Sequence, residues 1–392
     1  MEEFKTYLME DLIEEIAMGP FGSNIKVDCF VDSGVPVLNG ANLQGFKLRE
    51  DSFNYVTTEK ADSLNKANAY RGDIVITHRG TLGQIVYIPQ DSKYKRYVIS
   101  QSQFRVRVNP KVALPEYVVF YFHTRIGQHR LLANASQVGV PAIARPSTTF
   151  KKVEIELPCL KEQKRIIEII NSLSDKIELN NRINHNLEEQ ARIQFEAWCA
   201  KCVESKLIRE LSSNILDYTP NNHKKVILLN SSDVTEGRFE SLPFVDNQNL
   251  KGQFKKRFMK GDILYSEIRP RNHHFAICYF DADEYIASTR LMVIRKNEKE
   301  ISSDALLYQY LLMPSVLEEF TSKTESRSGT FPQGNYDDLS SSKVPYSSDN
   351  LQIGKALDAI YGVIWANMEE NKRLASIRDS LLPQLMSGLI TC

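Results

Sequence analysis

The chain has 392 residues with 49 basic and 49 acidic side chains, so its overall charge gives no support to nucleic-acid binding. A content of 42% hydrophobic and 25% charged residues is typical of a folded globular protein and excludes a disordered one. The sequence has no run of 18 apolar residues and no basic leader followed by an apolar run, so we expect a cytoplasmic protein without a membrane partner.

The N-terminal half begins with a predicted amphipathic helix over residues 1–18, which Gly19 and Pro20 would end. From residue 21 to about residue 157, short apolar runs separated by Gly, Pro, Asn and Asp predict strands joined by turns. Within this stretch we expect a helix over 114–132, a loop over 138–150 and a last strand over 151–158.

A long helix should follow, because hydrophobic residues recur there in alternating steps of four and three. This spacing has the period of about 3.5 residues that is typical of helices packed along a seam. Its positions are Ile166, Ile170, Leu173, Ile177, Asn180, Asn184, Leu187, Ala191, Gln194 and Trp198.

The C-terminal half repeats this order of elements. RGDIV at 71–75 matches KGDIL at 260–264, and YVIS at 97–100 matches YIAS at 285–288. A helix is expected from about residue 303 to residue 320, followed by a polar loop and a final strand. The loops differ between the halves, which favours two related tasks performed on two different targets.

A second long helix closes the chain with a seam of the same spacing. Ile177, Asn180, Asn184 and Leu187 recur 187 residues later as Ile364, Asn367, Asn371 and Leu374. The full seam is Ile353, Leu357, Ile360, Ile364, Asn367, Asn371, Leu374, Arg378, Leu381 and Leu385. Arg378 in the seam, together with Gly354 and Gly362, makes helix continuity and partner docking on this side less secure.

The two seams are predicted to pack on each other as antiparallel helices. Asn180, Asn184, Asn367 and Asn371 would then fix the register, because paired seam amides reject other alignments. A helix of about 35 residues is roughly 50 Å long, which is commensurate with one to one and a half turns of duplex DNA. Two unrelated amphipathic helices with polar breaks are the alternative.

Catalytic and metal motifs are missing from the sequence. We find no phosphate-binding glycine loop, no HExxH, no GxSxG and no methyltransferase-type Pro-Pro-aromatic run. Cys199 and Cys202 form a CxxC, but no second pair or nearby His completes a zinc site. We therefore expect recognition rather than chemistry, with no metal and no cofactor bound by this chain.

Candidate DNA contacts cluster in corresponding loops of the two halves. Arg can pair with guanine, and glycines allow close backbone approach. In the first half the candidates are Ser23, Asn24, Lys26, His78, Arg79, Ser136 and Gln137; in the second they are Arg269, Arg271, His273, His274, Ser326 and Arg327. Arg79 could equally be a solvated turn residue, and residues 23–26 could form an ordinary helix C-cap.

The sequence resembles a known protein family. Residues 157–198, LPCLKEQKRIIEIINSLSDKIELNNRINHNLEEQARIQFEAW, resemble the central helical region of the DNA specificity subunit of type I restriction-modification systems. GPFGSNIK at 19–26, VPVLNGANL at 35–43 and RGDIVITHRGTLGQ at 71–84 look like that family's target recognition domains, as do KGDILYSEIRPRN at 260–272 and YIASTRLMVIR at 285–295.

The resemblance implies a non-catalytic subunit that reads a bipartite, asymmetric site on double-stranded DNA. Two methylation subunits would dock on the paired helices, and restriction (motor-nuclease) subunits would join the complex. S-adenosylmethionine, ATP and Mg²⁺ would then belong to those partners. The implied fold is α+β: target recognition domains at 1–158 and 204–348, and spacer helices at 159–203 and 349–392, related by a pseudo-two-fold axis.

Two other functions remain open. The chain could be the recognition part of a stand-alone nuclease or methyltransferase, which catalysis by the purified chain would reveal. It could also be a coiled-coil scaffold with two accessory modules, which indifference to DNA would favour.

Overall fold

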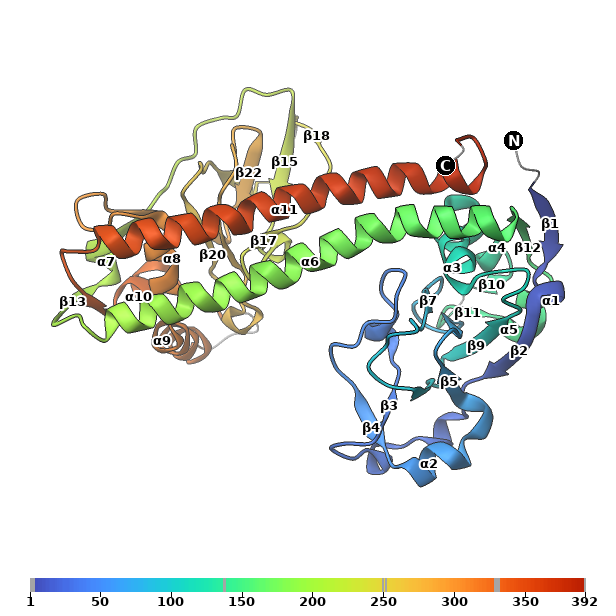
Figure 1. Cartoon of the computed structure of the whole chain (residues 1–392). Helices are drawn as coiled ribbons and strands as arrows, with labels where there is room; N and C mark the ends of the chain where they lie inside the picture. Colours follow the sequence, from blue (N-terminus) through green and yellow to red (C-terminus); the bar gives the residue numbers. More distant parts are fainter. Residues whose placement is uncertain (1–3, 137–138, 249, 251, 328–331, 391–392) are drawn as a thin grey trace. The chain divides into compact units, whose positions relative to one another are not determined.

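The structure is a computed structural model that describes residues 4–136, 139–248, 250, 252–327 and 332–390 (Figure 1). The chain divides into two compact units. Unit 1 comprises Met1–Ile177 and Lys372–Cys392, and unit 2 comprises Glu178–Asn371. No helix in the described part of the chain is long and apolar enough to cross a membrane.

Unit 1 contains two four-stranded sheets. The first is antiparallel, in the order β2 (Ile13–Met18), β9 (Gln103–Val108), β6 (Ile74–Thr77) and β7 (Ile85–Tyr87). The second has the order β4 (Asn54–Val56), β3 (Val35–Val37), β8 (Arg96–Val98) and β5 (Asn68–Tyr70), with β3 and β8 parallel. Two strand pairs complete it: β1 (Lys5–Leu8) with β12 (Glu154–Leu157), and β10 (Ala135–Ser136) with β11 (Ala142–Ile143).

The helices of unit 1 are short apart from the long helix segments. They are α1 (Met9–Leu12), α2 (Thr58–Ser63), α3 (Pro115–His123), α4 (Arg125–Leu132) and α5 (Pro146–Lys151). The predicted helix over 114–132 is therefore two helices, broken at the extended residue Thr124. The predicted loop over 138–150 contains most of α5.

The predicted N-terminal helix was wrong over its described residues. Residues 5–8 and 13–18 are strands, and only α1 between them is helical. β1 pairs with β12 and β2 pairs with β9, strands more than 80 residues away in the sequence. Pairing of this kind overrides local helical periodicity, because the strand hydrogen bonds and the buried face are supplied by distant segments.

Unit 2 repeats the strand order of unit 1. One sheet has the order β14 (Ser212–Asn214), β23 (Leu291–Lys296), β20 (Ile263–Ser266) and β21 (Phe275–Ile277). The other has the order β18 (Val245–Asp246), β15 (Lys225–Leu229), β22 (Tyr285–Ser288) and β19 (Phe254–Lys256), with β15 and β22 parallel. The strand pairs are β13 (Glu204–Leu207) with β24 (Lys343–Tyr346), and β16 (Val234–Thr235) with β17 (Arg238–Phe239).

The helices of unit 2 cover its first sheet with Leu and aromatic side chains. They are α7 (Ile208–Leu211), α8 (Asp304–Leu311), α9 (Pro314–Glu325) and α10 (Tyr336–Ser340). The helix expected over 303–320 is thus two helices, divided just before Pro314, which begins α9. The predicted fold class, two duplicated α/β modules with two long helices, is confirmed.

The repeated RGD and KGD segments build the same turn in both units. Asp73 Oδ2 accepts from the Tyr70 amide at 2.9 Å, and Asp262 Oδ2 accepts from the Met259 amide at 2.8 Å. Each aspartate is fully buried and paired with an arginine on the neighbouring strand: Arg107 Nε lies 2.8 Å from Asp73, and Arg295 Nε lies 2.6 Å from Asp262. The intervening glycines have positive φ, which glycine adopts without strain.

Both predicted long helices are continuous: α6 spans Leu160–Cys199 and α11 spans Leu351–Met386 (Figure 1). Gly354 and Gly362 do not interrupt α11. At Gly354 a Cβ would lie 2.2 Å from Ser302 Oγ, so a larger residue there would have to displace that hydroxyl. Of the twenty predicted seam positions, Gln194 alone is exposed; Phe195 beside it is buried.

Within unit 2 the two helices run antiparallel, with the seam asparagines in contact. Asn180 Nδ2 donates to Asn371 Oδ1 at 2.9 Å, and Asn367 Nδ2 donates to Asn184 Oδ1 at 2.8 Å. Asn180 also donates to Glu370 Oε2 at 2.7 Å. Within unit 1, Ile166 and Ile170 of α6 share a core with Leu382 and Leu385 of α11.

Candidate nucleic-acid interface

In unit 1 the candidate DNA contacts come from the loop that follows β6. The His78 amide donates to Ser102 O at 2.9 Å, which ties the loop to the turn before β9. The Ile143 amide donates to His78 O and the Gly80 amide to Pro141 O, both at 2.9 Å. Ser136 pairs with Ala142 across the β10–β11 hairpin. The predicted residues His78, Arg79 and Ser136 therefore lie together.

A second loop joins this cluster through Gln101. Gly22, in the 3₁₀ turn Gly22–Asn24, packs so closely on Gln101 that a Cβ would lie 2.1 Å from its Oε1. His78 Nε2 lies 3.2 Å from Gln101 O. Asn24, the last residue of this turn, and Lys26, two residues further on, are exposed. Three stretches, near residues 24, 79 and 136, are thus brought to one edge of unit 1.

Arg79 and Lys26 both bring positive charge to this edge. Burial lowers the pKa of His78, so its imidazole is neutral near pH 7. Arg79 is exposed, and Gly80 beside it has a positive φ with open space around its Cα. The arrangement offers one guanidinium on a backbone that a ligand can approach closely. Gln137 and the side chain of Ser23 lie outside the described part of the structure.

Unit 2 builds the equivalent loop on the same hydrogen-bond plan. The Glu267 amide donates to Arg290 O at 2.9 Å, as the His78 amide does to Ser102 O. An isolated bridge joins Ile268 to Gln333, and another joins Arg79 to Ala142 in unit 1. The loop between β20 and β21 thus corresponds to the loop between β6 and β7, but it carries different side chains.

The unit 2 loop contains two strained residues. Arg269 and His273 flank the 3₁₀ turn Pro270–Asn272 with φ of 50° and 52°. Left-handed conformations cost about 1–3 kcal/mol in residues other than glycine and persist where the surroundings enforce them. Arg269 is exposed at the start of this turn.

Two predicted arginines of unit 2 are engaged by carboxylates. Arg271 makes a two-pronged ion pair with Glu325, with both N···O distances 2.7 Å. Arg327 Nη2 lies 2.8 Å from Asp338 Oδ1. The pKa of Glu325 is lowered chiefly by its hydrogen bond to Arg271. The unit 2 loops therefore carry more charged groups than those of unit 1, largely in neutralised pairs.

The two predicted histidines point to other parts of unit 2. His274 Nδ1 lies 3.0 Å from Thr235 Oγ1 and 2.9 Å from Val234 O, both in β16. His273 Nδ1 lies 3.3 Å from Glu236 Oε1, and its ring stacks on Phe275. These contacts give both histidines packing roles within unit 2. Ser326 is exposed at the end of α9, next to Arg327.

Sequence reasoning missed three polar residues at these edges. Gln101 links two of the predicted loops in unit 1. Arg145 is exposed with a φ of 46° immediately before α5. Arg290 of unit 2 donates to Gln333. Gln101 and Arg290 lie one and two residues after the repeated YVIS and YIAS segments, and that proximity to the repeat was the signal that could have identified them.

The cysteines do not form a metal site in the described part of the chain, where no group of three His, Cys, Asp or Glu side chains is placed to hold an ion. Burial raises the pKa of Cys199 to about 12, so its thiol stays protonated. Cys202 Sγ lies 3.6 Å from Trp198 O at the end of α6.

Comparison with known proteins links the chain to one family. Residues 3–189 match the family described as "Type I restriction modification DNA specificity domain". The chain is 36% identical over 163 residues to the type I restriction enzyme HindI specificity subunit of Haemophilus influenzae, a match that covers 41% of this chain and 35% of that protein. The chain thus spans about a third of the length of this curated relative.

The fold is similar to that of the type I restriction-modification system S subunit from M. genitalium. The TM-score is 0.57 at 16% identity, over 98% of this chain and 96% of that one. At this identity the likeness concerns the fold alone.

Proposed function

Because residues 3–189 match the type I restriction modification DNA specificity domain, we propose that the chain is the specificity subunit of such a complex and reads a bipartite, asymmetric DNA site. The observation that carries this proposal is the duplicated loop plan, in which equivalent hydrogen bonds hold different side chains at the edges of units 1 and 2. Each unit would read one half-site.

The two loop sets favour different modes of contact. The edge of unit 1 offers Arg79 with Asn24, Gln101 and Ser136, groups that suit base edges and phosphates. The edge of unit 2 offers Arg269 beside arginines already paired with carboxylates. DNA would have to compete with Glu325 and Asp338 for those arginines, so we propose that unit 2 depends more on the shape of the DNA than unit 1 does.

The long helices would set the spacing and carry partner subunits. An unbroken helix of 40 residues, as in α6, is about 60 Å long. Leu179, Ile183 and Ile193 of α6, with Val363 and Ile377 of α11, are large apolar side chains exposed on helix surfaces. We propose that two methylation subunits dock on the surfaces of these helices. Restriction subunits would complete the complex, and S-adenosylmethionine, ATP and Mg²⁺ would act on those partners.

Methylation mapping of bacterial DNA tests this function. Co-expression of the full chain with its cognate methylation subunit should place adenine methylation in one two-part motif, which is lost without the chain. Arg79→Ala should relax or abolish one half of the motif, and Arg269→Ala the other. Methylation by the chain alone, or no two-part motif with its partner, would reject the proposal.

The chain offers a matched control for each variant. Lys111 and Lys299 are exposed and follow the ends of β9 and β23 that lie away from the candidate loops. Lys111→Ala and Lys299→Ala should leave both half-sites unchanged. If these variants altered the motif as strongly as the arginine variants, the loops would not be the reading surface.

A further inference from the structure

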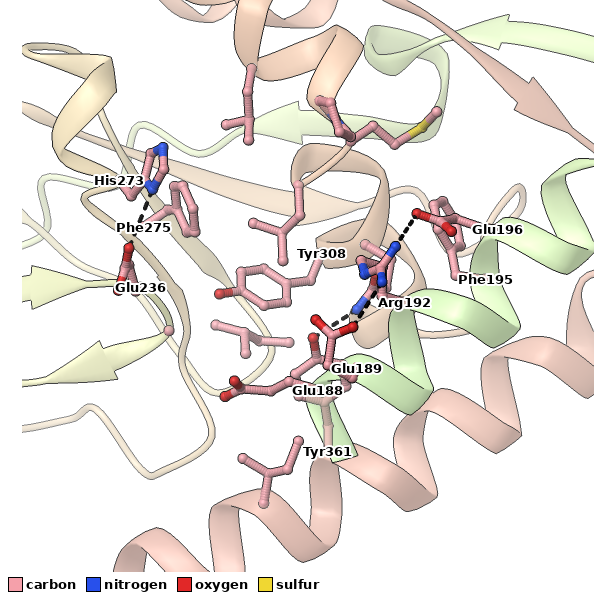
Figure 2. Close-up of a pocket in the computed structure, with 18 of the residues that line it drawn as sticks. Glu188, Glu189, Arg192, Phe195, Glu196, Glu236, His273, Phe275, Tyr308 and Tyr361 are labelled. Atoms are coloured by element: carbon pink, nitrogen blue, oxygen red, sulfur yellow. Dashed lines mark hydrogen bonds and ion pairs between the residues drawn. The ribbon is translucent and has the colours of Figure 1, made fainter. Parts of the chain in front are cut away.

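Unit 2 contains a cavity of about 660 Å³ that the DNA-reading proposal does not use (Figure 2). Its walls come from α6, the β16–β17 turn, β21, α8, the start of α9 and α11. Cavities of about 300–1,000 Å³ are the size that small organic ligands occupy.

The wall of the cavity is largely aromatic. Tyr308, Tyr361 and Trp365 form a chain of contacts, with ring centroids 5.7 Å apart for the first pair and 5.8 Å for the second. Phe195 and Phe275 also line it. Aromatic faces are negative, so a wall of this kind attracts apolar groups and cations alike.

Four carboxylates line the cavity, whereas only one guanidinium and one imidazole do so among the residues that the structure describes. Arg192 pairs with Glu189 at 2.7 Å and with Glu196 at 2.8 Å, so it is already shared by two acids. His273 lies against Glu236. In the described structure Glu188 has no hydrogen bond or ion pair, and the cavity therefore has an excess of negative charge.

Glu188 is directed at the aromatic wall. Figure 2 shows its side chain and the Tyr308 ring pointing into the same space. Burial raises the pKa of Glu188, while Arg238 and His185 act on it only through space to lower that pKa. The charge of Glu188 in turn helps to raise the pKa of Tyr361. A partly buried carboxylate without a partner is costly, and a bound cation would relieve that cost.

We propose that this cavity binds a small organic cation, with an ammonium or guanidinium group beside Glu188 and an apolar or aromatic body against Tyr308, Tyr361 and Trp365. The charge excess selects a cation, and the aromatic wall selects an apolar body. His273 of the candidate DNA loop forms part of one wall of the cavity, but the groups proposed to hold the cation lie on α6, α8 and α11, and occupancy of the site does not depend on the DNA-reading function.

Tryptophan fluorescence gives a local readout, because Trp365 lines the cavity and the only other tryptophan, Trp198, does not. In full-length Trp198→Phe protein, titration with 4-phenylbutylamine should change the emission saturably. The neutral analogue 4-phenylbutanol should bind at least about tenfold more weakly, since it lacks the charge-assisted hydrogen bond to Glu188. Calorimetric titration of the unsubstituted chain provides the same comparison without a tryptophan replacement.

Glu188→Gln should weaken the amine by about tenfold or more and leave the alcohol unchanged. Glu178→Gln is the matched control, since Glu178 is exposed on the same helix and does not line the cavity. Absence of saturable binding, equal affinity for amine and alcohol, or equal effects of the two substitutions would each overturn the proposal.

Discussion

Asn367 donates its side-chain amide to Asn184 Oδ1 across 2.8 Å, and Asn184 in turn donates to the Ile364 carbonyl at 3.3 Å. Asn184 is buried, with 3% of its surface exposed. The same seam holds the contact between Asn180 and Asn371. Two asparagine pairs in this largely apolar seam favour one alignment of α6 with α11 over others, because a shift would bury unpaired amides.

Replacing one asparagine of the Asn184–Asn367 pair should destabilise the protein more than replacing both. Asn184→Leu leaves the Asn367 amide without its partner, and we expect unfolding to become easier by about 1–3 kcal/mol. Asn184→Leu with Asn367→Leu should recover much of that loss, since two apolar side chains replace two polar ones. Urea unfolding of the two single variants and the double variant gives the coupling energy, and additive effects would show that the contact is not specific.

Replacement of all four seam asparagines by leucine should alter alignment rather than base preference. Without polar pairs, α6 and α11 can associate in other registers or with other copies of the chain. Sedimentation velocity should then detect additional oligomers, or methylation mapping should show a changed distance between half-sites. A changed base preference at constant spacing would contradict the register role.

The buried aspartates of the repeated turn should be among the most sensitive positions in each unit. Asp73→Asn removes the charge that faces Arg105 and Arg107, and loss of one partner of a buried pair costs about 3–5 kcal/mol. Asp262→Asn should act similarly through Arg295. Asp62→Asn, which breaks an exposed pair with Arg96, is the control and should cost about 0–1 kcal/mol. Thermal unfolding of the three variants tests this ranking.

His123 should make unit 1 less stable in mild acid. Its Nε2 lies 2.9 Å from Ile85 O, its ring packs edge-on against Phe46, and burial lowers its pKa, assisted by the charge of Arg378. The unfolded chain therefore takes up a proton near the ordinary pKa of about 6.5, before the folded chain does. The contribution of His123 to the stability of unit 1 is fully present above that pH. It is lost as the pH falls towards the pKa that His123 has in the folded chain.

Urea unfolding at pH 7 and at pH 5 measures this effect in the unsubstituted chain and in His123→Gln. The difference in the free energy of unfolding between the two proteins should change by at most about 1.4 kcal/mol per pH unit, the limit for one proton. His78, whose pKa is also lowered by burial, is present in both proteins and cancels in the comparison. Parallel pH profiles would assign the acid sensitivity to other groups.

Glu325 should restrain the DNA affinity of unit 2. Glu325→Gln removes the carboxylate that neutralises Arg271 and leaves an exposed guanidinium next to Arg269. We expect tighter binding of duplex DNA by the complex and a steeper salt dependence, by about one additional phosphate contact. Filter binding at several salt concentrations measures both quantities. Glu318→Gln, an exposed position on the same helix, should change neither.

The features of this protein that depend on local sequence spacing could be predicted from the sequence. The paired Asn positions, the two seams and the repeated turn segments depend on spacing within one element or on the repeat itself. The 3.5-residue period specifies which side of a helix is buried before any partner is known. Both long helices and the duplicated α/β modules accordingly match the sequence-based expectation.

Contacts between distant segments decided those features of the structure that the sequence did not predict. Residues 5–8 and 13–18 have helical periodicity but form strands, because β12 and β9 supply their hydrogen bonds. Arg271 and Arg327 look like free basic residues in the sequence, and only the fold places Glu325 and Asp338 against them. The cavity at Glu188 draws on segments from residue 188 to residue 368. The sequence alone determined the repeated scaffold and its apolar faces, because these follow local periodicity. The pairing of charges and the shape of the cavity were decided by the tertiary structure, because they depend on which distant side chains come into contact.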